Sequence, residues 1–187
     1  MSDAVKTPGR MVVISGPSGS GKTSVVRALR QLPGVEFSVS ATTRAMRAGE
    51  RDGVDYHFLS RADFEARREH GQLLEWAEYN GRLYGTLRAP MEKALREGRV
   101  FVLEIEVQGT RQLRAAKVPG TYVFLTPPGL GELRARLQAR GTDSAEEIER
   151  RVQIAAEEMK HQALYDHVIC NENLDATVAA VRAVLGL

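Results

Sequence analysis

The stretch MVVISGPSGSGKT, residues 11–23, decides the fold of this chain. Its first part, Met11–Ser15, is an apolar, β-branched run that predicts a buried strand. The glycine-rich loop Gly16–Gly21 follows, and the chain from Lys22 to Leu32 predicts a helix that ends before Pro33-Gly34. A strand, a glycine-rich loop and a helix in this order indicate an α/β fold.

The loop also carries chemistry, because it matches the phosphate-binding pattern G-x-x-x-x-G-K-[ST] at every fixed position. Its glycines let backbone N–H groups turn inward around a phosphate, and the helix that follows directs its positive end at the same point. In such loops the lysine reaches the β- and γ-phosphates and the hydroxyl ligates Mg²⁺. The pattern predicts a site for a nucleoside triphosphate with Mg²⁺, with Thr23 as metal ligand, made of Gly16, Pro17, Ser18, Gly19, Ser20, Gly21, Lys22 and Thr23.

Further apolar runs at Val100–Val107, Tyr122–Thr126 and His167–Cys170 predict buried strands. Helices are predicted between or beside them, at Arg88–Glu97, Leu130–Ala139, Ser144–Gln162 and Leu174–Leu185. Strands that alternate with helices are typical of a parallel sheet covered on both faces. We therefore expect an α/β fold with a P-loop three-layer parallel sheet core.

Two segments differ from this core in their sequence pattern. From Phe37 to Gly85, short alternating pieces and several glycines surround one helix, Ser60–His70, and predict an antiparallel insertion. A second, arginine-rich insertion near Thr126–Ser144 predicts a short helical lid. Ser60 with Asp63, and Ser144 with Glu147, have the spacing of capping boxes. The expected organisation is a flexible leader at 1–10, core with P-loop at 11–36, insertion at 37–87, core at 88–126, lid at 127–150 and core at 151–187.

Composition excludes several classes of protein. A chain of 187 residues suits one compact domain. Its formal net charge of +2 is too slight for a general nucleic-acid binder or a protein held on anionic membranes. The single Cys170 excludes an internal disulfide framework and suits a reducing, cytoplasmic compartment. The longest apolar runs are strand-sized, and Met1–Arg10 lacks the apolar centre of a signal peptide.

The first insertion holds candidate phosphate ligands. Arg44 and Arg47 lie three residues apart in a hydroxyl-rich stretch, and Tyr56 and Tyr84 follow within the same insertion. Two arginines and two tyrosines can bind a phosphate dianion through charge-assisted and neutral hydrogen bonds. Arginines on an exposed turn and tyrosines in a small core fit the same spacing. The spacing alone leaves both interpretations open.

Taken together, the motifs resemble the guanylate kinase family, P-loop enzymes that transfer the γ-phosphoryl group of ATP to GMP. The resemblance runs from about Val12 to Asp175 and keeps order and spacing. It implies a three-part body of parallel-sheet core, GMP-binding insertion and mobile lid. The segments that carry it are GPSGSGKT at 16–23, SVSATTRAMRAGE at 38–50, DGVDYHF at 52–58, LLEWAEYNGRLYGT at 73–86, LEIEVQG at 103–109, RLQARGTD at 136–143 and VICNENLD at 168–175.

The resemblance implies that Ser40, Glu75 and Thr86 read the guanine base. Guanine presents N1–H and N2–H₂ as adjacent donors, which one carboxylate can accept, and hydroxyl groups can donate to O6. Adenine would leave Glu75 facing a lone pair. Rejection of a base that leaves a buried polar group unpaired is the stronger form of discrimination. The positions that match the family's ligands of the GMP phosphate are Arg44, Arg47, Tyr56 and Tyr84.

Two carboxylates and the lid complete the expected site. Glu104 and Glu106 lie two apart near the end of the predicted strand Val100–Val107, so both should face the same side at the sheet edge where ligands bind, with GMP or Mg²⁺ as partner. In the lid, the resemblance implies that Arg136, Arg140 and Arg151 close over the triphosphate, and Asn171 matches a position near the donor nucleotide. Positioning and electrostatics would carry the transfer without a covalent intermediate, with the catalytic charges on Lys22, Arg44, Arg140 and Arg151.

Two other functions share part of this sequence pattern. A related P-loop kinase that acts on a phosphorylated sugar would keep the loop but would need no guanine reader, so Glu75 and Thr86 argue against it. A guanylate-kinase-like domain that binds phosphopeptides typically has a degraded loop, whereas Lys22 and Thr23 are in place here. The expected partners are ATP and GMP, with no nucleic acid and no membrane, and the oligomeric state stays open.

Overall fold

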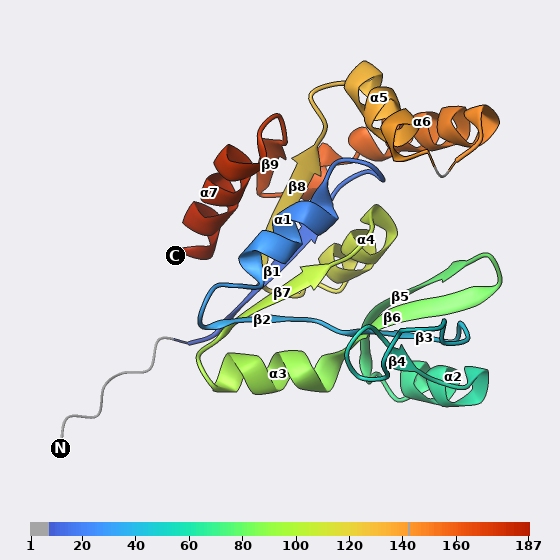
Figure 1. The fold of residues 1–187 in the computed structure, drawn as a ribbon. Coiled ribbons are helices and arrows are strands. Elements are labelled where there is room, and N and C mark those ends of the chain that lie inside the picture. The colour runs from blue at the N-terminus through green and yellow to red at the C-terminus, as the bar shows by residue number, and fades with distance from the viewer. Residues whose placement is uncertain (1–7, 142) are drawn as a thin grey trace.

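The structure is a computed structural model that describes residues 8–141 and 143–187, without the side chain of Arg140. Its main sheet has five strands in the order β2-β7-β1-β8-β9, each parallel to its neighbours (Figure 1). The strand that leads into the glycine-rich loop, β1, therefore lies in the middle of the sheet. The strands are β1 (Arg10–Ser15), β2 (Val35–Phe37), β7 (Val100–Glu104), β8 (Thr121–Thr126) and β9 (His167–Cys170).

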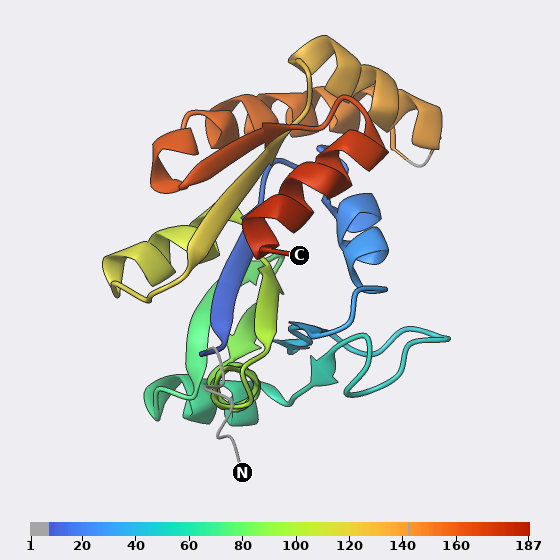
Figure 2. The same ribbon diagram turned by 90° about the vertical axis from the view of Figure 1, so that its left-hand side faces the viewer.

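The central strand buries side chains on both of its faces. Met11 and Val13 belong to one apolar core, and Val12 and Ile14 belong to the other. This alternation follows from the two-residue repeat of a strand that has helices on both sides. Helices α3 and α4 cover the first face, and α1 and α7 cover the second (Figure 2). The predicted three-layer α/β fold is confirmed, with helices α1 (Lys22–Leu29), α3 (Arg88–Arg96), α4 (Val107–Ala115) and α7 (Leu174–Leu185).

The first insertion forms a second sheet of four strands in the order β4-β3-β6-β5. Helix α2 packs on it through Phe64, which is buried against Ala41, Leu73 and Leu83. The pairs β3–β6 and β6–β5 are antiparallel as predicted, but β3 and β4 are parallel, because the long segment between them brings the chain back in the same direction. The elements are β3 (Ser40–Thr42), β4 (His57–Phe58), α2 (Arg61–Glu69), β5 (Leu73–Tyr79) and β6 (Arg82–Leu87).

The predicted strand Val100–Val107 is too long, and the helix after it was missed. β7 ends at Glu104, and α4 begins at Val107. The apolar alternation continues through Ile105 and Val107, both buried, so nothing in the pattern marks the change from strand to helix. Gly109, a weak helix former, obscures the helical signal further. Strand β6 was also not predicted as an element of its own.

Three segment boundaries differ from those expected. Arg10 opens β1, while residues 1–7 of the predicted leader lie outside the described residues. Phe37 pairs with Val102 in the main sheet, so the insertion sheet begins only at Ser40. The expected end of the lid at residue 150 falls in the middle of one helix, Ala145–Met159.

The lid segment is a helical hairpin of α5 (Leu130–Arg140) and α6 (Ala145–Met159). It has an apolar cluster of its own, and a 3₁₀ turn at Gln162–Leu164 leads from it to β9. None of the helices in the described residues is long and apolar enough to cross a membrane. The cluster is made of Leu133, Leu137, Ile148, Val152 and Ala155.

At both predicted capping boxes the serine caps the helix as expected. The Ser60 Oγ accepts a hydrogen bond of 3.0 Å from the Asp63 N–H at the start of α2. The Ser144 Oγ accepts one of 3.2 Å from the Glu147 N–H at the start of α6. Each hydroxyl satisfies a first-turn donor that the helix itself leaves free.

Ser60→Ala removes one of these caps and should lower the free energy of unfolding by about 1 kcal/mol. Urea denaturation measures the change. Ser24→Ala, at an exposed position inside α1, is the control and should stay within about 0.5 kcal/mol of the wild type. Equal losses in the two variants would contradict the capping role of Ser60.

Candidate active site

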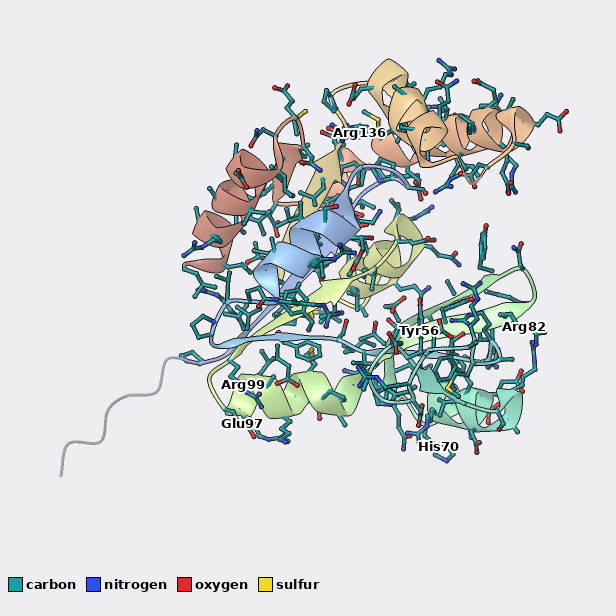
Figure 3. All side chains as sticks on the ribbon, viewed as in Figure 1. Tyr56, His70, Arg82, Glu97, Arg99 and Arg136 are labelled. Carbon is teal, nitrogen blue, oxygen red and sulfur yellow. The ribbon has the colours of Figure 1, made fainter. Side chains whose placement is uncertain are left out.

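A cavity of about 500 Å³ lies between the phosphate loop, the end of β7 and the insertion sheet. It collects residues that are far apart in the sequence, because parallel strands end at one edge of the main sheet and the insertion lies over that edge. Figure 3 shows Tyr56 in the insertion, low in the view, and Arg136, a residue of α5, high in the view. The predicted site residues that line the cavity are Lys22, Thr23, Ser40, Tyr56, Glu75, Tyr84, Glu104 and Glu106.

The phosphate loop connects the end of β1 to the start of α1 at Lys22. Gly16 has a φ of +149°, and a Cβ there would lie 2.1 Å from the Leu125 carbonyl oxygen on β8. Because that neighbour is backbone, only glycine fits at this point. The Ser20 N–H donates to the Pro17 carbonyl at 3.1 Å and closes the turn. The loop therefore has the shape that the motif predicts.

Lys22 lies folded over this loop. Its Nζ donates to the Gly16 carbonyl and, at 3.0 Å, to the Pro17 carbonyl. Burial lowers the pKa of Lys22, and the carboxylates of Glu104, Glu158 and Glu106 oppose that shift. Three carboxylates thus lie near one buried amine and favour its protonated form. A protonated amine is the form that binds an anionic ligand.

Glu104 and Glu106 both reach the cavity, but not from one strand as predicted. Glu104 is the last residue of β7, whereas Glu106 is the N-cap residue of α4. Burial raises the pKa of Glu104, and the positive charges of Lys22 and Arg30 oppose the shift. The backbone turn between the two residues, and not the alternation of a strand, brings both carboxylates to the cavity.

The base-reading candidates form one row across three strands of the insertion sheet. Ser40 on β3 lies opposite Thr86 on β6, and Thr86 lies opposite Glu75 on β5. The Thr86 Oγ1 donates to the Glu75 Oε1 at 2.7 Å, and the Glu75 residue is only 7% exposed. Burial raises the pKa of Glu75, and the Thr86 hydroxyl opposes the shift by its hydrogen bond. A buried carboxylate therefore faces the cavity with one oxygen held by a neutral donor.

The phosphate candidates are only partly gathered at the cavity. Tyr56 and Tyr84 line it with ring centroids 6.2 Å apart, whereas Arg44 and Arg47 are not part of its lining. The Arg44 guanidinium lies 5.3 Å from the Tyr56 ring centroid, so it is adjacent to the two tyrosines.

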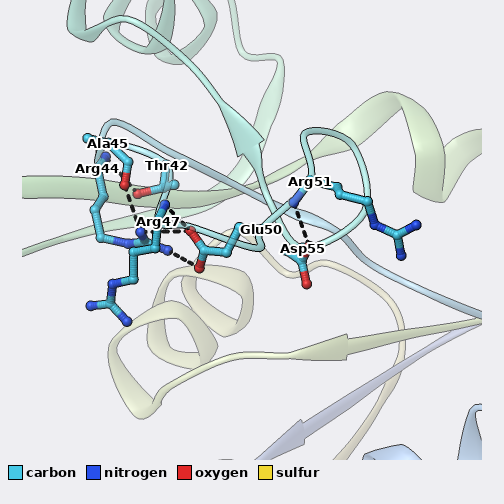
Figure 4. A network of polar contacts seen from close by, with 7 residues as sticks. All are labelled: Thr42, Arg44, Ala45, Arg47, Glu50, Arg51 and Asp55. Atoms are coloured by element: carbon cyan, nitrogen blue, oxygen red, sulfur yellow. Dashed lines mark hydrogen bonds and ion pairs between the residues drawn. The ribbon is translucent and has the colours of Figure 1, made fainter.

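Glu50, which none of the sequence motifs marks as a site residue, organises the two arginines. Its carboxylate accepts two hydrogen bonds from the Arg44 guanidinium, at 3.0 and 2.7 Å, and one of 2.7 Å from the Arg47 N–H (Figure 4). The Arg44 hydrogen bond lowers the pKa of Glu50. The sequence signal for this contact is the position of Glu50 three residues after Arg47, at the end of the segment SVSATTRAMRAGE.

The lid and β9 reach the phosphate loop from the other side. The Arg151 Nη2 on α6 donates to the Ser18 Oγ at 2.5 Å, and its Nη1 pairs with Asp143. The Arg136 Nη2 donates to the Asn171 carbonyl at 3.0 Å. Arg140 ends α5, and the expectation for its side chain lies outside the described part of the chain.

Asn171 is built into the protein as a brace of the loop. Its Nδ2 donates to the Ser20 carbonyl at 2.7 Å, and its Oδ1 accepts from the Thr177 hydroxyl at 3.0 Å. The residue is 6% exposed. The sequence placed Asn171 near the donor nucleotide, and the structure places its side chain against the loop that would hold that nucleotide.

A phosphate loop after the central strand of a parallel sheet, with a cavity shared by an inserted sheet, defines the class of P-loop kinases of small molecules. The family model described as guanylate kinase matches residues 8–186. The chain therefore belongs to the guanylate kinase family.

Individual relatives agree with this assignment. The chain is 44% identical over 178 residues to the guanylate kinase of Desulfitobacterium hafniense (strain Y51). The matched region covers 95% of this chain and 89% of that protein. It is 47% identical over 180 residues to that of Parasynechococcus marenigrum (strain WH8102), over 96% and 99% of the two chains. The crystal structure of guanylate kinase from Anaplasma phagocytophilum is 31% identical, with a TM-score of 0.76 and coverage of 97% of this chain and 86% of that one.

Asn171→Ala should loosen the phosphate loop, because it leaves the buried Ser20 carbonyl without its donor. We expect a loss of about 2 kcal/mol of unfolding free energy and about tenfold weaker ATP binding by calorimetry. Asn173→Ala removes only the cap of α7, so it should cost about 1 kcal/mol and leave ATP binding unchanged. Unchanged ATP affinity in the Asn171 variant would contradict its role as a brace.

Proposed function

We propose that this chain transfers the γ-phosphoryl group of ATP to GMP and so forms ADP and GDP. The observation that carries the proposal is a single cavity lined both by Lys22 of the phosphate loop and by the buried Glu75 carboxylate. The first side suits a triphosphate donor and the second a base with adjacent N–H donors. Membership of the guanylate kinase family supports the same activity.

The row Ser40, Thr86 and Glu75 would bind the base. Glu75 would accept from guanine N1–H and N2–H₂, and the Ser40 hydroxyl, which lines the cavity, would donate to O6, while the Thr86 hydroxyl donates to Glu75. Because Glu75 is buried, a base that offers it a lone pair would leave a desolvated charge without a partner. The same burial that is costly in the free protein therefore gives the site its selectivity.

Arg44, Arg47, Tyr56 and Tyr84 would hold the GMP phosphate. Arg44 has five N–H groups, of which two bond to Glu50 and one bonds to the Ala45 carbonyl. Glu50 thus fixes the guanidinium and leaves part of its donor set for a phosphate. The two tyrosines contribute hydroxyl groups from the cavity wall.

The donor would lie on the phosphate loop, with Lys22 at the transferred phosphate. Arg151 contacts the loop through Ser18, and Arg136 lies at Asn171 beside it, so both would supply positive charge on the lid side, together with Arg140. Thr23 and Glu104 line the cavity and offer the hydroxyl and carboxylate oxygens that suit Mg²⁺. When bound with ATP, Mg²⁺ neutralises charge on the phosphates.

An ADP-release assay with GMP, AMP, CMP and UMP tests the activity. We expect kcat/KM for GMP to exceed that for AMP by about 10³-fold or more. Absence of a preference for GMP would overturn the proposed function.

Glu75→Gln tests the base reader within that assay. The amide keeps one acceptor but turns an NH₂ toward a guanine donor, so kcat/KM for GMP should fall about 10²-fold while ATP binding is retained. Glu78→Gln, at an exposed position on the same strand, is the matched control. Unchanged GMP kinetics in the Glu75 variant would remove that residue from base recognition and leave the activity itself standing.

The raised pKa of Glu75 predicts opposite pH effects on binding and stability. Only the carboxylate accepts both guanine donors, so KM for GMP should rise as the pH falls, starting at a higher pH than an ordinary glutamate would give. The folded state binds this proton more tightly than the unfolded state, so protonation of Glu75 stabilises the fold as the pH falls through its folded pKa. KM for GMP and the urea midpoint, measured between about pH 5 and 8, report the two effects. Glu75→Gln should remove the contribution of this residue to the pH dependence of each. If Glu75 instead lowered the urea midpoint over the pH range in which GMP affinity falls, its assignment as the buried base reader would be contradicted.

A further inference from the structure

Strand β5, which carries Glu75, is an edge strand of the insertion sheet. One side pairs with β6, and the backbone groups of alternate residues point away from that partner. Trp76, the residue after Glu75, lies opposite Gly85 on β6. Unpaired N–H and C=O groups at such an edge need partners from elsewhere in the molecule.

Gln112 of α4 supplies both partners for Trp76. Its Oε1 accepts from the Trp76 N–H at 3.2 Å, and its Nε2 donates to the Trp76 carbonyl at 2.5 Å. One side-chain amide thereby replaces a neighbouring strand and fixes the backbone of β5 to a helix of the core. The contact lies directly beside Glu75, where the β5–β6 pairing has a register shift between Leu73 and Glu75.

Gly109, one turn earlier on α4, faces the Glu75 side chain itself. A Cβ at Gly109 would lie 2.5 Å from the Glu75 Oε2 and 3.0 Å from its Cδ. The helix backbone therefore forms the wall behind one carboxylate oxygen, while the Thr86 hydroxyl holds the other oxygen at 2.7 Å. The carboxylate is confined from both sides.

We propose that α4 sets the position of the Glu75 carboxylate, with Gln112 and Gly109 as positioning residues for the choice of base. The inference rests on the proposed role of Glu75 as the guanine reader. Through its two hydrogen bonds to Trp76, Gln112 fixes the position of β5 relative to the core. Because Gly109 has no side chain, the Glu75 carboxylate can lie against the helix backbone. Since Glu106, the N-cap residue of α4, lines the same cavity, one short helix ties the base reader to the core.

Gly109→Ala is the sharper test. The atom that the new methyl group meets is the end of a flexible side chain, so Glu75 should move while the fold is kept. Alanine is also the better helix former, so α4 itself is not weakened. We expect KM for GMP to rise about tenfold and KM for ATP to stay within about twofold.

IMP provides the readout that a merely structural defect would not change. Its base keeps N1–H and O6 but lacks the 2-amino group, so it uses less of the Glu75 carboxylate than GMP does. The wild-type preference for GMP over IMP should therefore shrink about tenfold in Gly109→Ala. Circular dichroism and thermal unfolding check that the variant is folded.

Gln112→Ala and Gln112→Glu test the second contact. The first leaves the Trp76 groups unpaired, and the second keeps the size but sets a carboxylate oxygen against the Trp76 carbonyl. Both should raise KM for GMP and reduce the preference for GMP over IMP, with little change in KM for ATP. Gln108→Ala, at an exposed position on the same helix, is the matched control and should behave as the wild type.

Parallel assays of Glu75→Gln separate the possible failures. If Glu75→Gln abolishes the preference for GMP while the Gly109 and Gln112 variants keep it, the inference is wrong and the proposed function stands. If Glu75→Gln itself keeps the preference, the base-reading role falls and the inference falls with it. When combined with Glu75→Gln, the Gly109 and Gln112 changes should have no further effect on the preference for GMP over IMP. If they reduce it by as much as they do in the wild type, they act by another route and the inference is overturned.

Discussion

The rest of the structure depends on the burial of β1 on both of its faces. Val12 and Ile14 pack toward α1 and α7, and Met11 and Val13 pack toward α3 and α4, so this one strand joins both apolar cores. A strand so confined ends at a fixed place, and the loop that follows it is fixed as well. Gly16 is pressed against the Leu125 carbonyl of β8, and Asn171 holds the Ser20 carbonyl from the far side. The geometry of the phosphate loop is therefore a consequence of core packing.

Against this rigid edge the insertion sets a buried negative charge. The Glu75 carboxylate is buried beside the Thr86 hydroxyl, which donates to it, and this burial destabilises the charged form and raises its pKa. A base that presents two N–H donors restores the hydrogen bonds that burial removed. In its proposed role as the base reader, Glu75 would therefore trade stability of the free protein for selectivity between bases. Helix α4 matters because it confines the same carboxylate from the core side.

Local signals predicted the parts of the fold that local chemistry controls. The strand–loop–helix order at the phosphate loop, the caps at Ser60 and Ser144, and the bounds of β9 and α7 all follow from short-range patterns and agree with the structure. The change from strand to helix after Glu104 was missed, because the burial of Ile105 and Val107 continues a strand-like alternation into a helix. The pairing of Arg44 with Glu50 was missed because a turn, and not a helical or strand repeat, brings them together.

By itself, the sequence determined the class of this protein and the identity of most candidate site residues, since the loop motif and the insertion motifs are contiguous and each carries its own chemistry. Only the tertiary structure decided which of them share one cavity: Lys22, Glu75 and Glu106 come from three separate elements. It also decided that Gly109 lies against Glu75 and that Gln112 bonds to the Trp76 backbone, and that Asn171 serves the loop through its amide. These relations depend on how α4, β5 and β9 pack, and packing distances between distant segments leave no periodic trace in the chain.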